Sequence, residues 1–521
     1  MNETQDKEWS ERVIYYFSHF RRTSPPSPTQ NPTENNPSRF RSPTGKVLVP
    51  SQLEPAAVEA LSNKGLCLVR GALPLLGSVV GVEAESVQHW VANEIKSWRK
   101  VLPLLARKEL SVQLSLLLAR WTIVAKPNLL ARTLPPHFTQ ACLEEFDQAV
   151  VETVEHRTQL HFDEFSRAML QLPIRLGGVG LCPSAETAPH AFVAGIAAAI
   201  SGFMGLSNMV KSGMWEIHKT KPTMQAALEV MQTYMNSPVK FDGKRYMADL
   251  DTFTKHFCYT KYSSKLQSRI VSAIREHNYS IFSDKNNLGH EERAHFSVRK
   301  NKHSAAAWKA YPLTEEFVLS DDDAVFMLQY ATRAPTPGLP KNCSCHATMS
   351  LEHAVHCDTA KLQRHNMLQH RLVAFAREQA VTTAQNVRLS LVEAKKKQEP
   401  DIIFYFRPKP LETDVTVVNP CAPSKLLQTL ARADSAMQAR CNVKNNKYLL
   451  NAHERGNDFV PLGFETHGRF TKQVVDLLTK LAGNTPDNIG HAVSDMTLDL
   501  SLCLVRGNAL CARRVPFAFA T

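Results

Sequence analysis

Three cysteines and one histidine lie close together in the sequence: Cys343, Cys345, His353 and Cys357. Thiolates and a neutral imidazole are the usual ligands of structural Zn²⁺, which binds four donors tetrahedrally. A single residue separates the first two cysteines, which is closer than in common zinc motifs, and His346 and His356 are rival ligands. The alternative is a group of buried, reduced thiols with surface histidines. We predict a zinc site that stabilises a loop without a core of its own.

Two aspartates flank a candidate β-hairpin between residues 401 and 419, where β-branched and aromatic residues alternate. If Phe406 pairs with Leu411 across the turn, Asp401 lies opposite Thr416. Asp414 then becomes its diagonal neighbour on the same face, at about 7 to 8 Å. A shift of the register by one residue would place the two carboxylates on opposite faces.

Two carboxylates at this range can share a Mg²⁺ ion, which orients a water and neutralises charge on a phosphodiester. A lysine would then stabilise the negative charge that develops, and Lys444 and Lys447 in KNNKY are candidates. Glu465 in GFETHG is a candidate further acid. Acids at strand edges or in turns explain the same residues without any catalysis.

The composition is that of a basic, globular chain. Of the 521 residues, 43% are hydrophobic and 21% charged. This excludes a wholly disordered or fibrous protein and leaves room for roughly two to four domains. The net charge of +12 favours an anionic partner, with nucleic acid as the first candidate. Eleven irregularly spaced cysteines and an acidic N-terminus without an apolar run indicate a reducing compartment and no secretion.

The pattern of residue types divides the chain into segments. Residues 22–50 are dense in Pro, Ser, Asn and Thr and are predicted to be a disordered tether. Helical spacing of apolar residues follows, and the run Ala191–Leu206 is too short to span a membrane, so we predict a buried helix there. A basic amphipathic helix with Arg364 and Arg371 is expected after Cys357, a pattern more typical of a solvated surface helix than of a nucleic-acid reader.

The order of the motifs resembles the C-terminal part of the polyproteins of non-LTR retrotransposons. In chain order the matching segments are LPIRLGGVGL, APHAFVAG, CSC with HAVHC, RHN, PDIIFYF, DVTVVNPCAPS, KNNKY and FVPLGFETHGRF. They occur in patches from about Gly65 to Leu481. In the branch that this chain resembles, that part carries a restriction-enzyme-like endonuclease.

The resemblance implies an α+β multidomain protein with a helical thumb-like region, a small zinc knuckle and a PD-(D/E)XK-like α/β nuclease core. The expected segments are a disordered N-terminal tether at 1–53, a reverse-transcriptase thumb-like region at 54–310, a zinc knuckle and basic helix at 311–384, the nuclease core at 385–485 and a C-terminal tail at 486–521. The polymerase palm is not expected, because no Tyr-x-Asp-Asp motif precedes the thumb-like region and Asp321–Asp323 follow it.

The resemblance also implies roles for residues in the cysteine–histidine cluster and the hairpin. The family's zinc knuckle falls on Cys343, Cys345, His353 and Cys357. Its nuclease pattern, a basic residue, Pro-Asp and then a second acid, falls on Pro400, Asp401 and Asp414, with 12 residues between the two aspartates. Glu399 stands where Arg or Lys is usual, a departure that affects a substrate or local charge contact rather than the metal-binding acids.

Further contacts follow from the same resemblance. The family's lysine falls on Lys444 or on Lys447, with Tyr448 beside it, and Glu465 stays a candidate acid. The implied nucleic-acid contacts are Arg364, His365 and Arg371, in and after the RHN motif.

These observations predict a Mg²⁺-dependent endonuclease that nicks target DNA, so that its free 3′ end primes reverse transcription. The chain would be a truncated C-terminal part of the polyprotein, without polymerase activity of its own. Its expected cofactors are structural Zn²⁺ and catalytic Mg²⁺, its partners are target DNA and the element RNA with no membrane, and its location is the nucleus. The alternatives are a non-catalytic nucleic-acid-binding remnant of the element and a zinc-stabilised helical interaction protein whose charge is incidental.

Overall fold

The residues that the structure describes are mainly helical. The computed structural model describes residues 46–49, 54–63, 67–75, 77–81, 83–202, 208–235, 240–241, 244–245, 266–284, 288–335, 342–343, 345–357, 361–386, 400–483 and 489–514. Small sheets accompany the helices, so the predicted α+β class is confirmed at this level. The chain divides into two units, residues 1–70 and 71–521.

The first unit contains a short parallel strand pair. Strand β1 (Lys46–Val49) pairs with β2 (Cys67–Arg70), and helix α2 (Pro55–Ser62) lies between them in the sequence. The prediction of a disordered tether over 1–53 is therefore wrong for 46–49, because KVLV is an apolar, β-branched run with a partner strand in CLVR. The remaining tether residues, 1–45 and 50–53, lie outside the described residues.

The second unit begins with a hairpin and a helical region. The elements are β3 (Ala72–Leu75), β4 (Ser78–Gly81), α3 (Ala84–Arg99), α4 (Leu102–Leu105), α5 (Val112–Leu118), η1 (Ala119–Ile123), α6 (Asn128–Thr133), α7 (Pro136–Thr158), α8 (Glu164–Gln171), η2 (Ile174–Leu176), η3 (Ala185–Thr187) and α9 (Ala188–Gly202). Helices α3 and α7 pack through Trp98 and Phe146, whose rings meet edge to face with centroids 5.9 Å apart. Helix α9 is largely buried, which agrees with the buried helix predicted from residue 191 on, and residues 203–206 of that prediction lie outside the described residues. No helix among the described residues is long and apolar enough to cross a bilayer.

The next elements lead to an acidic helix N-terminus. They are α10 (Asn208–Lys219), α11 (Pro222–Met235), β5 (Lys240–Phe241), β6 (Lys244–Arg245), α13 (Leu266–Phe282), α14 (His290–Arg299), η5 (Ala307–Lys309), η6 (Glu315–Phe317) and α15 (Asp321–Thr332). The Asp321 carboxylate accepts a hydrogen bond from the Val112 amide (2.8 Å) and pairs with Arg157 (2.6 Å). Asp323 pairs with Arg513 at 2.8 Å. These two acids therefore hold helices together.

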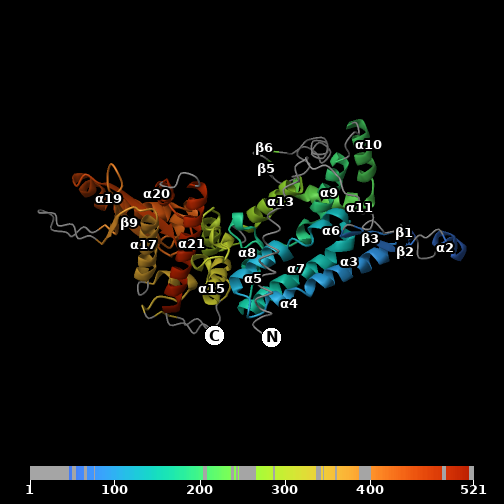
Figure 1. Ribbon diagram of the computed structural model, residues 1–521, viewed down its shortest axis with the longest axis horizontal. Helices are drawn as coiled ribbons and strands as arrows, with labels where there is room; N and C mark the ends of the chain where they lie inside the picture. The colour runs from blue at the N-terminus through green and yellow to red at the C-terminus, as the bar shows by residue number, and fades with distance from the viewer. Residues whose placement is uncertain are drawn as a thin grey trace, which may run out of the picture. The chain divides into compact units, whose positions relative to one another are not determined.

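A four-stranded mixed sheet forms the C-terminal part of the unit, drawn in orange and red in Figure 1. Its strands are β7 (Thr383–Gln385), β8 (Ile402–Phe404), β9 (Leu411–Val418) and β10 (Asp458–Glu465), and the surrounding helices are α16 (Leu351–His356), α17 (Lys361–Glu378), α18 (Leu426–Ala431), α19 (Ser435–Glu454), α20 (Lys472–Ala482) and α21 (Ile489–Arg514). The strand order is β10-β9-β8-β7, with β10 parallel to β9 and the other pairs antiparallel.

The two faces of the sheet are covered by different helices. Side chains such as Val415 and Phe464 pack with residues of α17, α20 and α21 in one apolar core. On the other face, Gly463 lies close to Met437 and Cys441 of α19, where a Cβ would approach their side chains to 3.1 and 2.8 Å. The segment 486–521, predicted as a tail, thus contributes a 26-residue helix to this core.

The hairpin register differs from the prediction by two residues. Phe404, not Phe406, pairs with Leu411, and Ile402 pairs with Thr413. The amide of Tyr405 is bonded to the Thr382 carbonyl instead (3.0 Å). A shift of two residues conserves the alternation of faces, so Asp401 moves towards Asp414 rather than to the opposite side.

Replacing Phe404 by Ala should destabilise the sheet by about 3–5 kcal/mol, because its fully buried ring (0% exposed) would leave a cavity. Tyr405→Ala is the matched control. Tyr405 is the next residue in the chain and is 48% exposed, so the loss of its side chain should cost about 0.5 kcal/mol or less. Hydrogen exchange of β9 amides measures both effects. Equal protection in the two variants would contradict this packing.

Candidate functional site

Asp401 and Asp414, the acid pair, meet where β8 and β9 begin to pair. The Asp401 amide donates to the Thr413 carbonyl (2.9 Å), and its Oδ2 accepts a hydrogen bond from the Val415 amide (2.7 Å). Asp401 is therefore bonded to the residues on either side of Asp414. Asp414 lies in the middle of β9 and is 2% exposed. Backbone pairing thus holds the two carboxylates side by side.

The electrostatics of the acid pair are unfavourable without a counter-ion. Burial, followed by the charge of Asp401, raises the pKa of Asp414, while Lys444 lowers it. The Lys444 ammonium lies 2.7 Å from Oδ1 and 2.9 Å from Oδ2 of Asp414. His365 approaches the other acid, with Nε2 3.3 Å from Asp401 Oδ2. Lys444 therefore compensates the charge of Asp414, and His365 faces Asp401.

Helix α19 distinguishes the two candidate lysines. Lys444 and Tyr448 are four residues apart, on one side of the helix, and the buried Tyr448 ring packs on Phe459 with centroids 5.3 Å apart. Lys447 instead donates to the Tyr448 hydroxyl (2.6 Å). The structure brings Lys444 to the acid pair and uses Lys447 to hold Tyr448.

Glu465 is not brought to the acid pair. Asp414 pairs with Pro461, whereas Glu465 pairs with Val418 at the far end of β10. The two positions are four residue steps apart along the strand, which corresponds to about 13 Å. Burial raises the pKa of Glu465 to about 8, and its Oε2 lies 3.3 Å from Arg469 Nε. The candidate further acid is thus separate from the metal-binding position that the sequence indicated.

The three implied nucleic-acid contacts occupy different environments. Arg364 is 1% exposed and donates to the Val355 carbonyl (2.7 Å) and to Asn508 (2.8 Å), so it is an internal group rather than the expected nucleic-acid contact. Arg371 pairs with Asp499 and lies over the Phe375 ring. His365 lies beside the acid pair, at the Asp401 carboxylate.

The four residues of the predicted zinc site converge and are called the knuckle cluster: Cys343, Cys345, His353 and Cys357. Their donor atoms all lie within 4.8 Å of one another. The Cys343 and Cys357 sulfurs are 3.7 Å apart, and the Cys345 sulfur is 3.2 Å from His353 Nε2. Tetrahedral Zn²⁺ with bonds of about 2.3 Å to sulfur places two sulfur ligands about 3.8 Å apart, which the Cys343–Cys357 distance matches. The knuckle cluster therefore has donors and spacing suited to Zn²⁺.

Local structure explains this convergence. The Cys343 amide bonds to the Ala347 carbonyl (2.9 Å), which folds the first two cysteines into a tight turn. Ser350 caps helix α16 by accepting from the His353 amide, and Cys357 follows its last residue. The rival ligands His346 and His356 are not among the four donors that meet.

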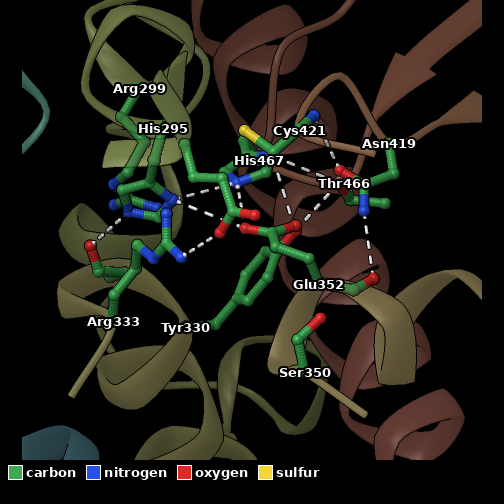
Figure 2. Close-up of polar contacts among 12 residues, drawn as sticks. His295, Arg299, Tyr330, Arg333, Ser350, Glu352, Asn419, Cys421, Thr466 and His467 are labelled. Carbon is green, nitrogen blue, oxygen red and sulfur yellow. Dashed lines mark hydrogen bonds and ion pairs between the residues drawn. The ribbon is translucent and has the colours of Figure 1, made fainter. Parts of the chain in front are cut away.

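A second group of possible metal ligands, which the sequence did not predict, is called the inner cluster: His295, Glu352, Cys421 and His467 (Figure 2). All four are buried, and burial lowers the pKa of His295 to about 3, so its ring is neutral. Their positions are spread from 295 to 467, so no local spacing could have revealed them. The only sequence signal was indirect, because Cys421 and His467 lie in segments of the resemblance.

Comparison of the sequence with protein-family models and with curated proteins gave no match.

Changing Cys345 and Cys357 together to Ser should remove one equivalent of zinc per chain, because Ser offers no thiolate to the ion. Elemental analysis of the purified, dialysed protein measures the loss. Cys503→Ser is the control, since this buried cysteine of α21 lies outside both clusters and its loss should leave the metal content unchanged. An unchanged zinc content in the double variant would contradict the assignment.

Proposed function

We propose that this chain is a Mg²⁺-dependent endonuclease that nicks DNA, and that it is the C-terminal part of a non-LTR retrotransposon polyprotein. The observation that supports the proposal is the convergence of Asp401 and Asp414 in a mixed sheet, with Lys444 at one carboxylate and His365 at the other. The order of these residues agrees with the nuclease motif that the sequence resembles.

The acid pair suits a divalent ion. Burial and the charge of Asp401 both raise the pKa of Asp414, so two ionised carboxylates are unfavourable there without added positive charge. Carboxylate oxygens are the ligands that Mg²⁺ prefers. Mg²⁺ held by this pair would activate a water and neutralise charge on the phosphodiester.

The surrounding residues of the chain have distinct tasks in this proposal. The Lys444 ammonium supplies positive charge beside Asp414, where it stabilises the negative charge that develops on phosphate oxygens. His365 and the Val415 amide orient the Asp401 carboxylate. Tyr448 keeps α19 against β10 and so holds Lys444 in place.

The partners follow from the same proposal. Target DNA is the substrate, and its free 3′ end would prime reverse transcription of the element RNA in the nucleus by a polymerase active site outside this chain. The net charge of +12 favours binding of either polyanion. Zn²⁺ in the knuckle cluster would be structural.

One observation favours the second candidate function, a nucleic-acid-binding remnant that does not cut. Lys444 contacts both carboxylate oxygens of Asp414 and so neutralises this acid without a metal. The sequence also has Glu399 where the family has a basic residue. Such a protein would bind DNA or RNA with a strong salt dependence and leave the strands intact.

Asp414→Asn should lower Mg²⁺-dependent nicking of supercoiled DNA by about 100-fold or more, because it removes a charged ligand of the metal. Asp458→Asn, a change of an exposed acid at the start of β10, is the matched control and should nick at the wild-type rate. Gel analysis of plasmid conversion at equal protein concentration gives both rates.

The same samples distinguish the two functions when DNA binding is measured as well. Wild-type binding without Mg²⁺-dependent nicking would support the non-catalytic remnant. Equal nicking by wild type and Asp414→Asn would contradict the endonuclease.

A further inference from the structure

Four buried side chains from distant parts of the second unit point towards one position in the inner cluster (Figure 2). His295 lies on α14, Glu352 on α16, Cys421 after β9 and His467 in the turn after β10. None is more than 8% exposed. Buried polar groups of this kind must be satisfied by one another or by a bound ion.

The distances within the inner cluster agree with the edges of a metal tetrahedron. His467 Nε2 lies 3.2 Å from His295 Nδ1 and 3.2 Å from Glu352 Oε1, and the last two atoms are 3.6 Å apart. Four ligands with bonds of about 2.0 to 2.1 Å to Zn²⁺ have edges of about 3.4 Å. The Cys421 sulfur is within 4.8 Å of each of the three atoms.

The inner cluster contains more hydrogen-bond acceptors than protons to satisfy them. His295 Nε2 lies 2.9 Å from the Ala331 carbonyl, which can only accept, so Nε2 carries the proton. Nδ1 is then the ring nitrogen that faces the cluster, 3.2 Å from His467 Nε2. Glu352 Oε1 is an acceptor at the same distance from His467 Nε2, and this nitrogen carries at most one proton to share between His295 Nδ1 and Glu352 Oε1. A cation would satisfy these acceptors together.

Hydrogen bonds from surrounding residues hold the candidate metal ligands Glu352 and Cys421 in place. The Tyr330 hydroxyl donates to Glu352 Oε2 (2.9 Å), which leaves Oε1 for the cluster. The Cys421 amide bonds to Asn419 Oδ1 (3.0 Å), and the Asn419 side chain donates to the Glu352 carbonyl (3.0 Å). Metal-binding imidazoles and carboxylates in proteins are held in this way by outer hydrogen bonds.

We propose that His295, Glu352, Cys421 and His467 bind a second Zn²⁺ ion, which is structural. A thiolate with two imidazoles selects zinc over the hard ions Mg²⁺ and Ca²⁺. Glu352 and the Cys421 thiolate would together neutralise the charge of the ion. All four coordination positions are then filled by the protein, as in structural rather than catalytic zinc sites.

The second ion would join three parts of the chain. Helix α16 supplies Glu352 to the inner cluster and the next residue, His353, to the knuckle cluster. It would therefore lie between two zinc ions. Through His295 and His467, the inner ion would also link helix α14 to the sheet that carries the acid pair.

Metal analysis of the purified full chain tests this proposal. We expect two equivalents of zinc in the wild type and in Cys503→Ser, and one in His467→Gln. The Cys345→Ser/Cys357→Ser variant should also hold one, and combining it with His467→Gln should leave none. One equivalent in the wild type, or two in a folded His467→Gln protein, would overturn the proposal.

X-ray absorption at the zinc edge of the wild type decides the matter even if His467→Gln fails to fold. The knuckle cluster alone gives three sulfur ligands to one nitrogen, whereas both clusters together give equal numbers of sulfur and of nitrogen or oxygen ligands. The equal ratio is expected. The three-to-one ratio would show that the inner cluster is held by hydrogen bonds without a metal.

Discussion

Strand β9 buries two acids on one face, and the positive charge for both comes from Lys444 of helix α19 and from Arg455, which directly follows this helix. Glu412 is fully buried and receives two hydrogen bonds from Arg455 (2.9 and 2.6 Å) and one from Asn457 (2.7 Å). Asp414, two residues further on, is paired with Lys444. Because an uncompensated buried carboxylate is costly, α19 cannot leave the sheet without a large loss of stability. This constraint fixes the face of the sheet on which the acid pair lies.

The pairing of Glu412 with Arg455 differs in geometry and surroundings from the pairing of Asp414 with Lys444. A guanidinium binds a carboxylate in a fixed, two-pronged geometry, and Asn457 completes the pairing of Glu412. Asp414 instead has a flexible lysine and a second carboxylate beside it, and its pKa is raised by burial and by Asp401. Perturbed acids in such surroundings are typical of functional sites. A bound metal ion would relieve the electrostatic cost of placing these two carboxylates side by side.

The sequence was informative where the relevant residues are close together. The knuckle cluster is set by local spacing, and alternation predicted strands β8 and β9. The register was misjudged because Tyr405 bonds to Thr382 on the far side of β8, a contact that no hairpin pattern contains. The inner cluster and the burial of Arg364 depend on packing between segments far apart in the chain. Periodicity of a single segment carries no information about such packing.

Anomalous diffraction from crystals grown with Mn²⁺ in place of Mg²⁺ shows directly whether Asp401 and Asp414 hold a divalent ion. We expect a manganese peak between the two carboxylates and no such peak in Asp414→Asn crystals grown under the same conditions. Wild-type crystals in which Lys444 still contacts both oxygens of Asp414, with no manganese between the two acids at a saturating concentration, would contradict it.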